Sequence, residues 1–191
     1  MEIHRPNFFV FTGGPGVGKT TLLRHLESLG ESVVDESARA VIREDPAARG
    51  GEAFFRRIVE RDVAAFDRLA GETRRVFFDR GLMDAYGADG VPPWPELIEA
   101  LRMRRYAERV FVFPPWREIY ATDAERIQGF AHAQRVFGIV MDQLPRLGYR
   151  PVLVPIGTVE ERAKFVLSEA QVSTKARSRT KSPGSAIEPS T

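Results

Sequence analysis

The eight residues from Gly13 to Thr20 read G-G-P-G-V-G-K-T and match G-x-x-x-x-G-K-[ST], the pattern of a phosphate-binding loop, or P-loop. Glycines at this spacing let the backbone curl so that successive N–H groups point at phosphate oxygens. Lys19 would bring a positive charge to the β- and γ-phosphates, and the Thr20 hydroxyl would ligate Mg²⁺. Such a loop works only between a strand and the N-terminus of a helix, so this motif constrains the fold more than any other feature. The residues predicted to hold the nucleotide are Gly13, Gly14, Pro15, Gly16, Val17, Gly18, Lys19, Thr20 and Thr21.

The sequence on either side of the loop supplies the required context. An apolar run at residues 7–12 is typical of a buried parallel strand. After the loop, Leu22, Leu26 and Leu29 follow at helical spacing, and Gly30 ends the predicted helix. The P-loop is therefore predicted between a strand and a helix.

Apolar strands and amphipathic helices alternate along the rest of the chain, which is typical of a parallel sheet with helices on both faces. The predicted strands are 7–12, 32–35, 75–79, 109–113 and 151–155, and the predicted helices are 21–29, 37–44, 52–70, 82–86, 96–106, 118–147 and 158–170. The long helical region is expected to break near Gly129 or Gly138, and Thr158 with Glu161 forms a predicted capping box. We predict an α/β fold: a three-layer α/β/α P-loop NTPase, Rossmann-like, with a mostly parallel five-stranded sheet in the order 2-3-1-4-5 and a helical lid.

Length and charge indicate one domain with a tail. The chain of 191 residues is long enough for one α/β domain, which we assign to residues 1–170. Residues 171–191 are rich in Ser, Thr, Lys, Arg and Pro and are expected to be a disordered basic tail. The tail has four Lys or Arg against one Glu, a charge of +3, whereas the whole chain has +2. The domain itself therefore carries −1, so we expect no nucleic-acid partner.

Composition also bears on location. No apolar run reaches the ~18 residues of a membrane helix, the chain has no Cys, and its start lacks a signal-peptide pattern. We therefore expect a cytoplasmic protein without a membrane partner, either a monomer or a homodimer. Its only asparagine is Asn7, so the guanine-reading N-K-x-D motif of GTPases cannot occur.

The predicted strand at 75–79 ends in a candidate metal ligand. Three apolar residues precede Asp79, as in a Walker B strand, and ligands of open α/β sheets gather at this end of the strands. Asp79 is expected to hold Mg²⁺ opposite Thr20, directly or through a water, although it could instead only cap the next turn. Arg80 stands where ATPases that split water usually have Glu. An Asp-Arg pair here is similar to that of nucleoside and nucleotide kinases, where the guanidinium can neutralise the transferring phosphoryl group. Alternatively, Arg80 pairs with a local acid.

Two acids follow the second predicted strand and should open on the same edge of the sheet. Either Asp35 or Glu36 could accept a proton from a substrate hydroxyl as it attacks phosphorus. The alternative is that both are ordinary acids at a helix N-terminus. Arg39, one helical turn further on, could anchor an anionic or carbonyl group of the acceptor.

Arginines after the fourth predicted strand could form the lid. Small-molecule kinases carry an arginine-bearing lid here, which closes over the phosphates and excludes water. Arg117 and Arg126 are the candidates, with Arg135 as a third, and the alternative for each is a solvated helix face. Trp94 and Trp116 adjoin prolines and could line a substrate pocket, although packing under loops is the simpler expectation.

Several of these segments together resemble a known family. They are residues 9–22, the Glu36-x-x-Arg39 element, Phe77–Gly81 followed by Asp84, and Phe113–Tyr120 with its Pro-Pro-Trp. They look like the small AAA-like predicted ATPases, a family grouped with the nicotinamide-riboside kinase domain of NadR. The resemblance covers about residues 7–168 and implies ATP binding, a kinase-like core and an Arg-containing lid, without fixing the acceptor.

The sequence thus predicts a protein that binds Mg²⁺ and ATP and transfers the γ-phosphoryl group to a small hydroxyl or phosphate acceptor. The alternatives are a slow ATP hydrolase, in which another acid such as Glu36 positions water, and a nucleotide-gated switch that recruits a protein. The predicted catalytic residues are Lys19, Asp35, Glu36, Arg80, Arg117 and Arg126; the predicted acceptor-binding residues are Glu36, Arg39, Arg80 and Asp84; the predicted metal ligands are Thr20 and Asp79.

Overall fold

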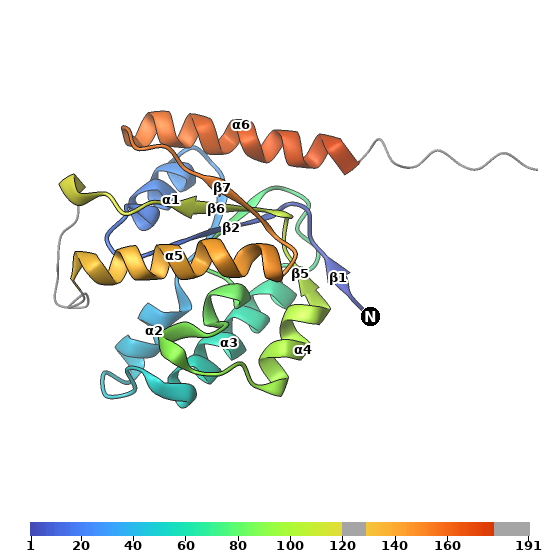
Figure 1. Cartoon of the computed structure of the whole chain (residues 1–191). Coiled ribbons are helices and arrows are strands. Elements are labelled where there is room, and N and C mark those ends of the chain that lie inside the picture. Colours follow the sequence, from blue (N-terminus) through green and yellow to red (C-terminus); the bar gives the residue numbers. More distant parts are fainter. Residues whose placement is uncertain (120–128, 178–191) are drawn as a thin grey trace, which may run out of the picture.

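A parallel sheet lies at the centre of the computed structural model, which describes residues 1–119 and 129–177 (Figure 1). Its strands are β2 (Phe8–Gly13), β3 (Ser32–Val34), β4 (Val76–Asp79), β6 (Arg109–Phe113) and β7 (Arg150–Leu153). They lie in the order β3-β4-β2-β6-β7, and every pairing is parallel. Counted along the chain, these five strands have the predicted order 2-3-1-4-5, with the P-loop strand β2 in the middle.

The continuous apolar run of β2 explains why this central strand is buried on both faces. Along β2, Phe8 and Val10 join one hydrophobic core, whereas Phe9 and Phe11 join the other. Successive side chains of a strand point to opposite faces, so a continuous apolar run needs cover on both sides. The sequence of β2 therefore requires a layer of helices above and below the sheet.

Helices supply both layers. One face is covered by α3 (Gly51–Arg68), α4 (Pro95–Met103) and α5 (Phe130–Arg146), and the other by α1 (Lys19–Ser28) and α6 (Val159–Arg177), while α2 (Ser37–Glu44) packs on α3 (Figure 1). Short 3₁₀ turns form at η1 (Leu82–Ala85), η2 (Ala88–Gly90) and η3 (Arg117–Ile119). The predicted three-layer α/β/α architecture is confirmed.

The end of α4 differs from the prediction. The helix ends at Met103 rather than at Tyr106, because Arg104–Arg105 forms strand β5 and pairs with β1 (Ile3–His4). Tyr106 then leaves the helix pattern and is buried against the ring of Phe66. This pairing joins segments about 100 residues apart, which local periodicity does not register.

The predicted lid and tail fall partly outside the described residues. Helix α5 begins immediately after Gly129, one of the two expected break points, and continues through Gly138 without a break. The remainder of the predicted lid helix, residues 120–128, lies outside the described part. Helix α6 starts with the predicted capping box but runs to Arg177 instead of ending near residue 170, since no Gly or Pro interrupts it. Residues 178–191 of the predicted tail lie outside the described residues.

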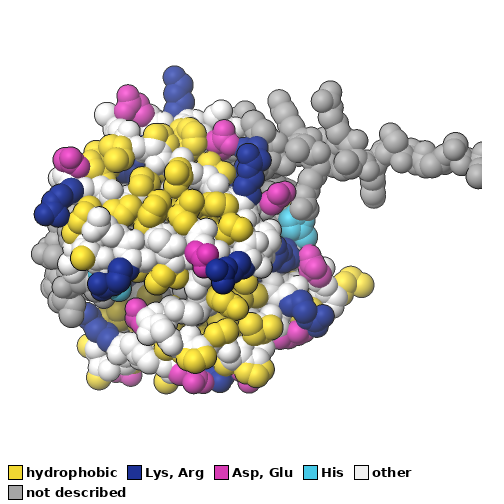
Figure 2. Space-filling view, viewed as in Figure 1, with side chains coloured by type: hydrophobic (Ala, Val, Ile, Leu, Met, Phe, Trp, Pro, Cys, Tyr) yellow, Lys and Arg dark blue, Asp and Glu magenta, His cyan; other side chains and the backbone are white. Residues whose placement is uncertain are grey.

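The outer edge of the sheet is apolar. Figure 2 shows hydrophobic side chains gathered between α5 and α6, where β7 lies, and Leu153 and Ile156 are 50% and 57% exposed. The backbone N–H groups of Arg150 and Val154 donate inward, to the carbonyl oxygens of Glu108 and Val112, so the outward-facing backbone positions are 151 and 153. Pro151 has no N–H, which makes this edge a poor template for a further strand. Within the described residues, no helix has the length and apolarity to cross a bilayer.

Candidate active site

The P-loop is a tight turn that leads directly into α1. Gly13, Gly16 and Gly18 have φ values of 130°, 73° and 82°, which favour glycine over residues with a side chain. A Cβ on Gly13 would also lie 2.6 Å from the carbonyl oxygen of Phe113. No side chain caps the N-terminus of α1, so its first N–H groups face the loop. This geometry is the one that binds phosphate at a helix N-terminus.

Lys19 is buried inside the loop. Its Nζ donates hydrogen bonds to the carbonyl oxygens of Gly14 at 2.8 Å and Gly13 at 3.3 Å. Burial, assisted by the nearby charge of Arg80, lowers the pKa of Lys19 to about 8. The loop carbonyls thus hold the ammonium group in place beside the cavity.

Thr20 and Asp79 meet at the end of the central strands. The Thr20 hydroxyl donates to Oδ2 of Asp79 at 2.8 Å, and Oδ1 of Asp79 is buried without a hydrogen-bond partner. Burial is the main reason that the pKa of Asp79 is raised, against the opposing charge of Lys19. A hydroxyl and a carboxylate with one unpartnered oxygen fit Mg²⁺, which usually takes one or two protein ligands and completes its shell with phosphate and water. Among the described residues, no cluster of three acidic or histidine side chains offers another metal site.

Glu36 joins two arginines across the cavity from the P-loop. It accepts a hydrogen bond from Nε of Arg80 at 2.8 Å and another from Nε of Arg39 at 3.0 Å. Burial by itself would raise the pKa of Glu36, but the charges of Arg80, Lys19 and Arg39 outweigh it and lower the pKa to about 2. Glu36 is therefore ionised at any physiological pH.

Asp84 also binds the guanidinium of Arg80. Its Oδ1 accepts from Nη1 of Arg80 at 3.1 Å and also from the Thr12 hydroxyl, and its Oδ2 accepts from the N–H of Gly81 at 3.0 Å. These bonds use most of the acceptor capacity of the carboxylate. Asp84 lines the cavity, as its predicted role requires, but its contacts are mainly those of a support for Arg80.

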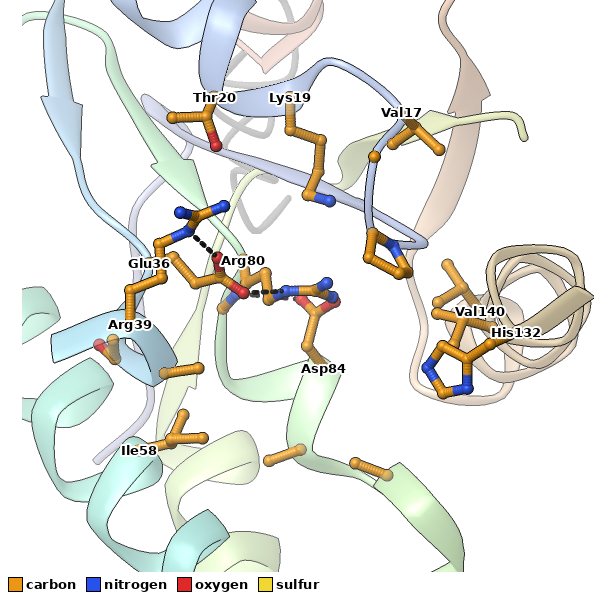
Figure 3. Close-up of a pocket in the computed structure, with 18 of the residues that line it drawn as sticks. Val17, Lys19, Thr20, Glu36, Arg39, Ile58, Arg80, Asp84, His132 and Val140 are labelled. Atoms are coloured by element: carbon orange, nitrogen blue, oxygen red, sulfur yellow. Dashed lines mark hydrogen bonds and ion pairs between the residues drawn. The ribbon is translucent and has the colours of Figure 1, made fainter. Parts of the chain in front are cut away.

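A cavity of about 860 Å³ brings these groups together. Figure 3 shows Lys19 and Thr20 on the P-loop side, with Glu36, Arg39, Arg80 and Asp84 grouped opposite them. Ile58 comes from α3, and His132 and Val140 come from α5. The apolar part of the wall includes Phe54, Phe55, Ile58, Val136, Ile139 and Val140.

The cavity also contains a carboxyl group that sequence reasoning missed. Asp62 of α3 accepts a hydrogen bond from the hydroxyl of Ser37 at 2.5 Å. Burial, reinforced by the charges of Asp84 and Glu36, raises the pKa of Asp62 to about 7. In the sequence, Asp62 stands in the middle of a regular helix pattern, and no local signal marks it as a site residue.

Asp35 does not join the site. Its side chain is 65% exposed, pairs with Arg24, and does not line the cavity. The extended backbone of Glu36, with φ −60° and ψ 116°, precedes α2, so neighbouring side chains point in different directions. Of the two candidate acids, only Glu36 faces the P-loop.

Only some of the predicted lid arginines and tryptophans line the cavity. The guanidinium of Arg117 lies 5.0 Å from the ring centre of Phe130 and does not line the cavity, whereas Arg135 does. Arg126 lies outside the described residues. Trp116 lines the cavity, but Trp94 is buried in the core, as the simpler expectation had it.

A further arginine reaches the P-loop end of the cavity. Arg162 of α6 is 5% exposed and donates from Nη2 to the carbonyl oxygen of Val17 at 3.0 Å. No local sequence pattern marks Arg162 as a site residue, because its partner Val17 lies 145 residues away.

Comparison with known proteins supports this description. A family model described as an AAA domain matches residues 8–162. No curated protein sequence gives a significant match. Among solved structures, the chain is similar to the NadR protein in complex with NR, with 19% identity and a TM-score of 0.71 over 88% of this chain and 52% of that one. The chain thus spans about half the length of that NadR chain.

Two smaller enzymes are similar over nearly their whole lengths. Deoxyadenosine kinase from M. mycoides has 11% identity and a TM-score of 0.61 over 86% of this chain and 99% of its own. Shikimate kinase from Acinetobacter baumannii, in complex with shikimate, has 19% identity and a TM-score of 0.52 over 92% and 96%. At such identities the likeness concerns the fold, which is the α/β fold of P-loop kinases.

Proposed function

The chain belongs to the AAA domain family, and from that premise we propose that it is a phosphotransferase that uses Mg²⁺ and ATP to phosphorylate a small acceptor at a hydroxyl group. The observation that carries the proposal is the cavity in which the P-loop faces Glu36 and Arg80. The Gly13–Thr21 segment and Lys19 would hold the phosphates, and Thr20 with Asp79 would hold Mg²⁺. ATP, bound with Mg²⁺, would supply the phosphoryl group, and the opposite wall of the cavity would bind the acceptor.

Glu36 is suited to orient the acceptor hydroxyl. Because it is ionised and faces the P-loop, it can accept a hydrogen bond from a hydroxyl that points at the phosphates. A pKa of about 2 makes it a weak proton acceptor. A loose phosphoryl-transfer transition state requires mainly positioning and charge stabilisation, so a strong base is unnecessary. Arg80, beside Glu36, can stabilise charge on the transferring group.

The charged groups next to Glu36 favour a neutral or cationic acceptor over a phosphate or carboxylate. Arg39 and Arg80 both bind Glu36, and Asp62 and Asp84 add further acidic groups. Beside Glu36, an anionic acceptor would therefore meet carboxylates and arginines that already have a counter-charge. The apolar wall from α3 and α5 fits a ring or other apolar part of the same molecule.

The test is acceptor-dependent release of ADP. The protein is incubated with Mg²⁺ and ATP and with panels of neutral hydroxyl compounds, such as nucleosides and sugars, and of anionic compounds, such as nucleoside monophosphates and hydroxy acids. We expect turnover only with a member of the neutral or cationic panel. Glu36→Gln should lower that turnover about 100-fold, in the range of a positioned catalytic carboxylate.

Asp35→Asn is the matched control, because it removes the neighbouring carboxylate outside the cavity and should leave turnover unchanged within about twofold. Equal ADP release with and without every acceptor would instead identify a hydrolase. Tight ATP binding without any turnover would identify a nucleotide-gated switch.

A further inference from the structure

Arg162 is one of four polar or charged side chains that are almost completely buried among the described residues. The other three are Thr12, Lys19 and Asp79, all of which belong to the P-loop strand or the nucleotide site described above. Arg162 comes from the first turns of α6, at the opposite end of the sequence. Its burial beside these groups suggests that it serves the same site.

The contacts of Arg162 tie α6 to the P-loop backbone. Nη2 donates to the carbonyl oxygen of Val17 at 3.0 Å. Nη1 lies 2.7 Å from the position that a Cβ on Gly18 would occupy, so a side chain at residue 18 would displace the guanidinium from this position. The central carbon of the guanidinium lies 4.9 Å from the ring centre of Phe113 and 5.7 Å from that of Trp116. The cation is thus held between two aromatic rings and the loop.

The charge of Arg162 has no acidic partner in the part of the chain that the structure describes. Its Nε is buried without a hydrogen-bond partner, and burial alone lowers its pKa, with no neighbouring charge that acts against it. Aromatic faces attract a cation but do not neutralise it. A buried cation without a counter-charge costs free energy, and an anion that binds nearby offsets that cost. The P-loop, which Arg162 touches, is the place where such an anion would bind.

We propose that Arg162 is a positioning residue for the P-loop: it fixes the backbone at Val17 and Gly18 and favours binding of the phosphate groups across the loop. Consequently, Arg162 lowers the stability of the nucleotide-free protein and strengthens the bound state. The inference rests on the proposed nucleotide site but not on the identity of the acceptor or on phosphoryl transfer.

The experiment compares two variants by calorimetry and thermal unfolding. Arg162→Met keeps an unbranched apolar side chain at this position but removes the charge and the hydrogen bond to Val17, and Arg162→Lys keeps the charge. The probes are Mg²⁺ with ATP and Mg²⁺ with tripolyphosphate, which has no nucleoside. Arg162→Met should weaken binding of both probes by a similar factor, about tenfold, whereas its midpoint of unfolding without ligand should be equal to or higher than that of the wild type. Arg162→Lys should recover most of the affinity.

Arg109→Met is the matched control. Arg109 also contacts α6, through Glu169, but does not line the cavity. Arg109→Met removes the same positive charge from the protein as Arg162→Met, and it should leave the affinities for both probes within about twofold of the wild-type values.

Three results would overturn the inference. The first is an Arg162→Met variant that is less stable without ligand but binds both probes as the wild type does, since Arg162 would then only pack. The second is weaker binding of ATP with unchanged binding of tripolyphosphate, since Arg162 would then contact the nucleoside. The third is equal weakening by Arg109→Met, since net charge alone would then account for the effect. If the wild type itself binds neither probe, the proposed function fails together with this inference.

Discussion

Arg80 is held in an unfavourable backbone conformation by the groups around it. Its φ of 73° lies in the left-handed region, which costs a residue with a side chain about 1–2 kcal/mol. Its N–H donates to the carbonyl oxygen of Phe11 at 2.9 Å, and its guanidinium binds Glu36 and Asp84. The turn at Arg80 takes the chain out of β4 and directs the side chain into the cavity. Strain of this kind persists where the surroundings fix a functional group in place.

Asp62 should make the protein less stable at neutral pH than at mildly acidic pH. Its pKa is raised from 3.8 to about 7, so between these values the folded protein holds a proton that the unfolded chain has released. The free energy of unfolding therefore falls as pH rises through that window, and the destabilisation is complete above pH 7. Asp62→Asn can keep the hydrogen bond from Ser37 and should remove this part of the pH dependence. The measurement is the midpoint of thermal unfolding between pH 5 and pH 8.

The control for Asp62 is Asp67→Asn on the same helix. Asp67 pairs with Arg104 and its pKa is lowered, so its contribution to stability is lost only in more acidic solution. The unfolding midpoint of Asp67→Asn should therefore change with pH as that of the wild type does between pH 5 and pH 8. If the unfolding midpoint of Asp62→Asn changes with pH as steeply as that of the wild type, the carboxyl group of Asp62 is ionised in the folded protein and this account of it is wrong.

Residues that belong to a motif or end a strand could be found in the sequence, whereas Asp62 and Arg162 could not. Lys19, Asp79 and Arg80 are marked by the P-loop pattern and by the end of an apolar run. Asp62 and Arg162 reach the site from the interiors of helices, through contacts with segments 25 and 145 residues away. Helical periodicity accounts for their burial but not for their partners.

At the scale of elements, α5 and the P-loop fit so closely that Gly14 has no room for a side chain. A Cβ on Gly14 would lie 2.6 Å from Cα and 2.8 Å from Cβ of Ala133. The φ of Gly14 is not positive, so close packing rather than backbone conformation requires glycine here. Gly14→Ala should force α5 and the loop apart, with a loss of about 1–3 kcal/mol in stability. We also expect about tenfold weaker binding of ATP, because the loop that positions the phosphates moves.

Gly138→Ala, in α5 itself, is the matched control for this prediction. A Cβ at residue 138 would meet nothing within 4 Å, so alanine should raise the free energy of unfolding by about 0.5–1 kcal/mol through helix propensity. Urea unfolding and ATP titration of both variants provide the measurements. An unchanged ATP affinity in a destabilised Gly14→Ala protein would show that α5 supports the fold without positioning the loop.

The order of the elements was predictable because each central strand carries its own apolar run. The family resemblance seen in the sequence agrees with the AAA domain match. Strand β6 has the predicted bounds, and so does α2. The short sheet of β1 with β5 and the true end of α4 depend on a pairing between distant segments, which no local pattern contains.

At the scale of the whole molecule, the P-loop extends from the strand that two cores share. Phe8 and Val10 pack with α3 and α5, Phe9 and Phe11 pack with α1 and α6, and β2 then continues into the loop. A ligand that holds the loop should therefore stabilise both cores together. We expect one cooperative unfolding transition, and an upward shift of the whole transition when Mg²⁺ and ATP are added.

The size of that shift follows from mass action. A ligand at 100 times its dissociation constant adds about 2.7 kcal/mol, which for a domain of this size raises the midpoint by roughly 5–11 °C. Lys19→Ala should keep the ligand-free midpoint nearly unchanged, because among the described residues the lysine donates only to loop carbonyls. It should abolish most of the shift, because the proposed function assigns the charge of Lys19 to phosphate binding. Scanning calorimetry at several ATP concentrations measures both effects. Two separate transitions, of which ATP moves only one, would show that β2 does not couple the two cores.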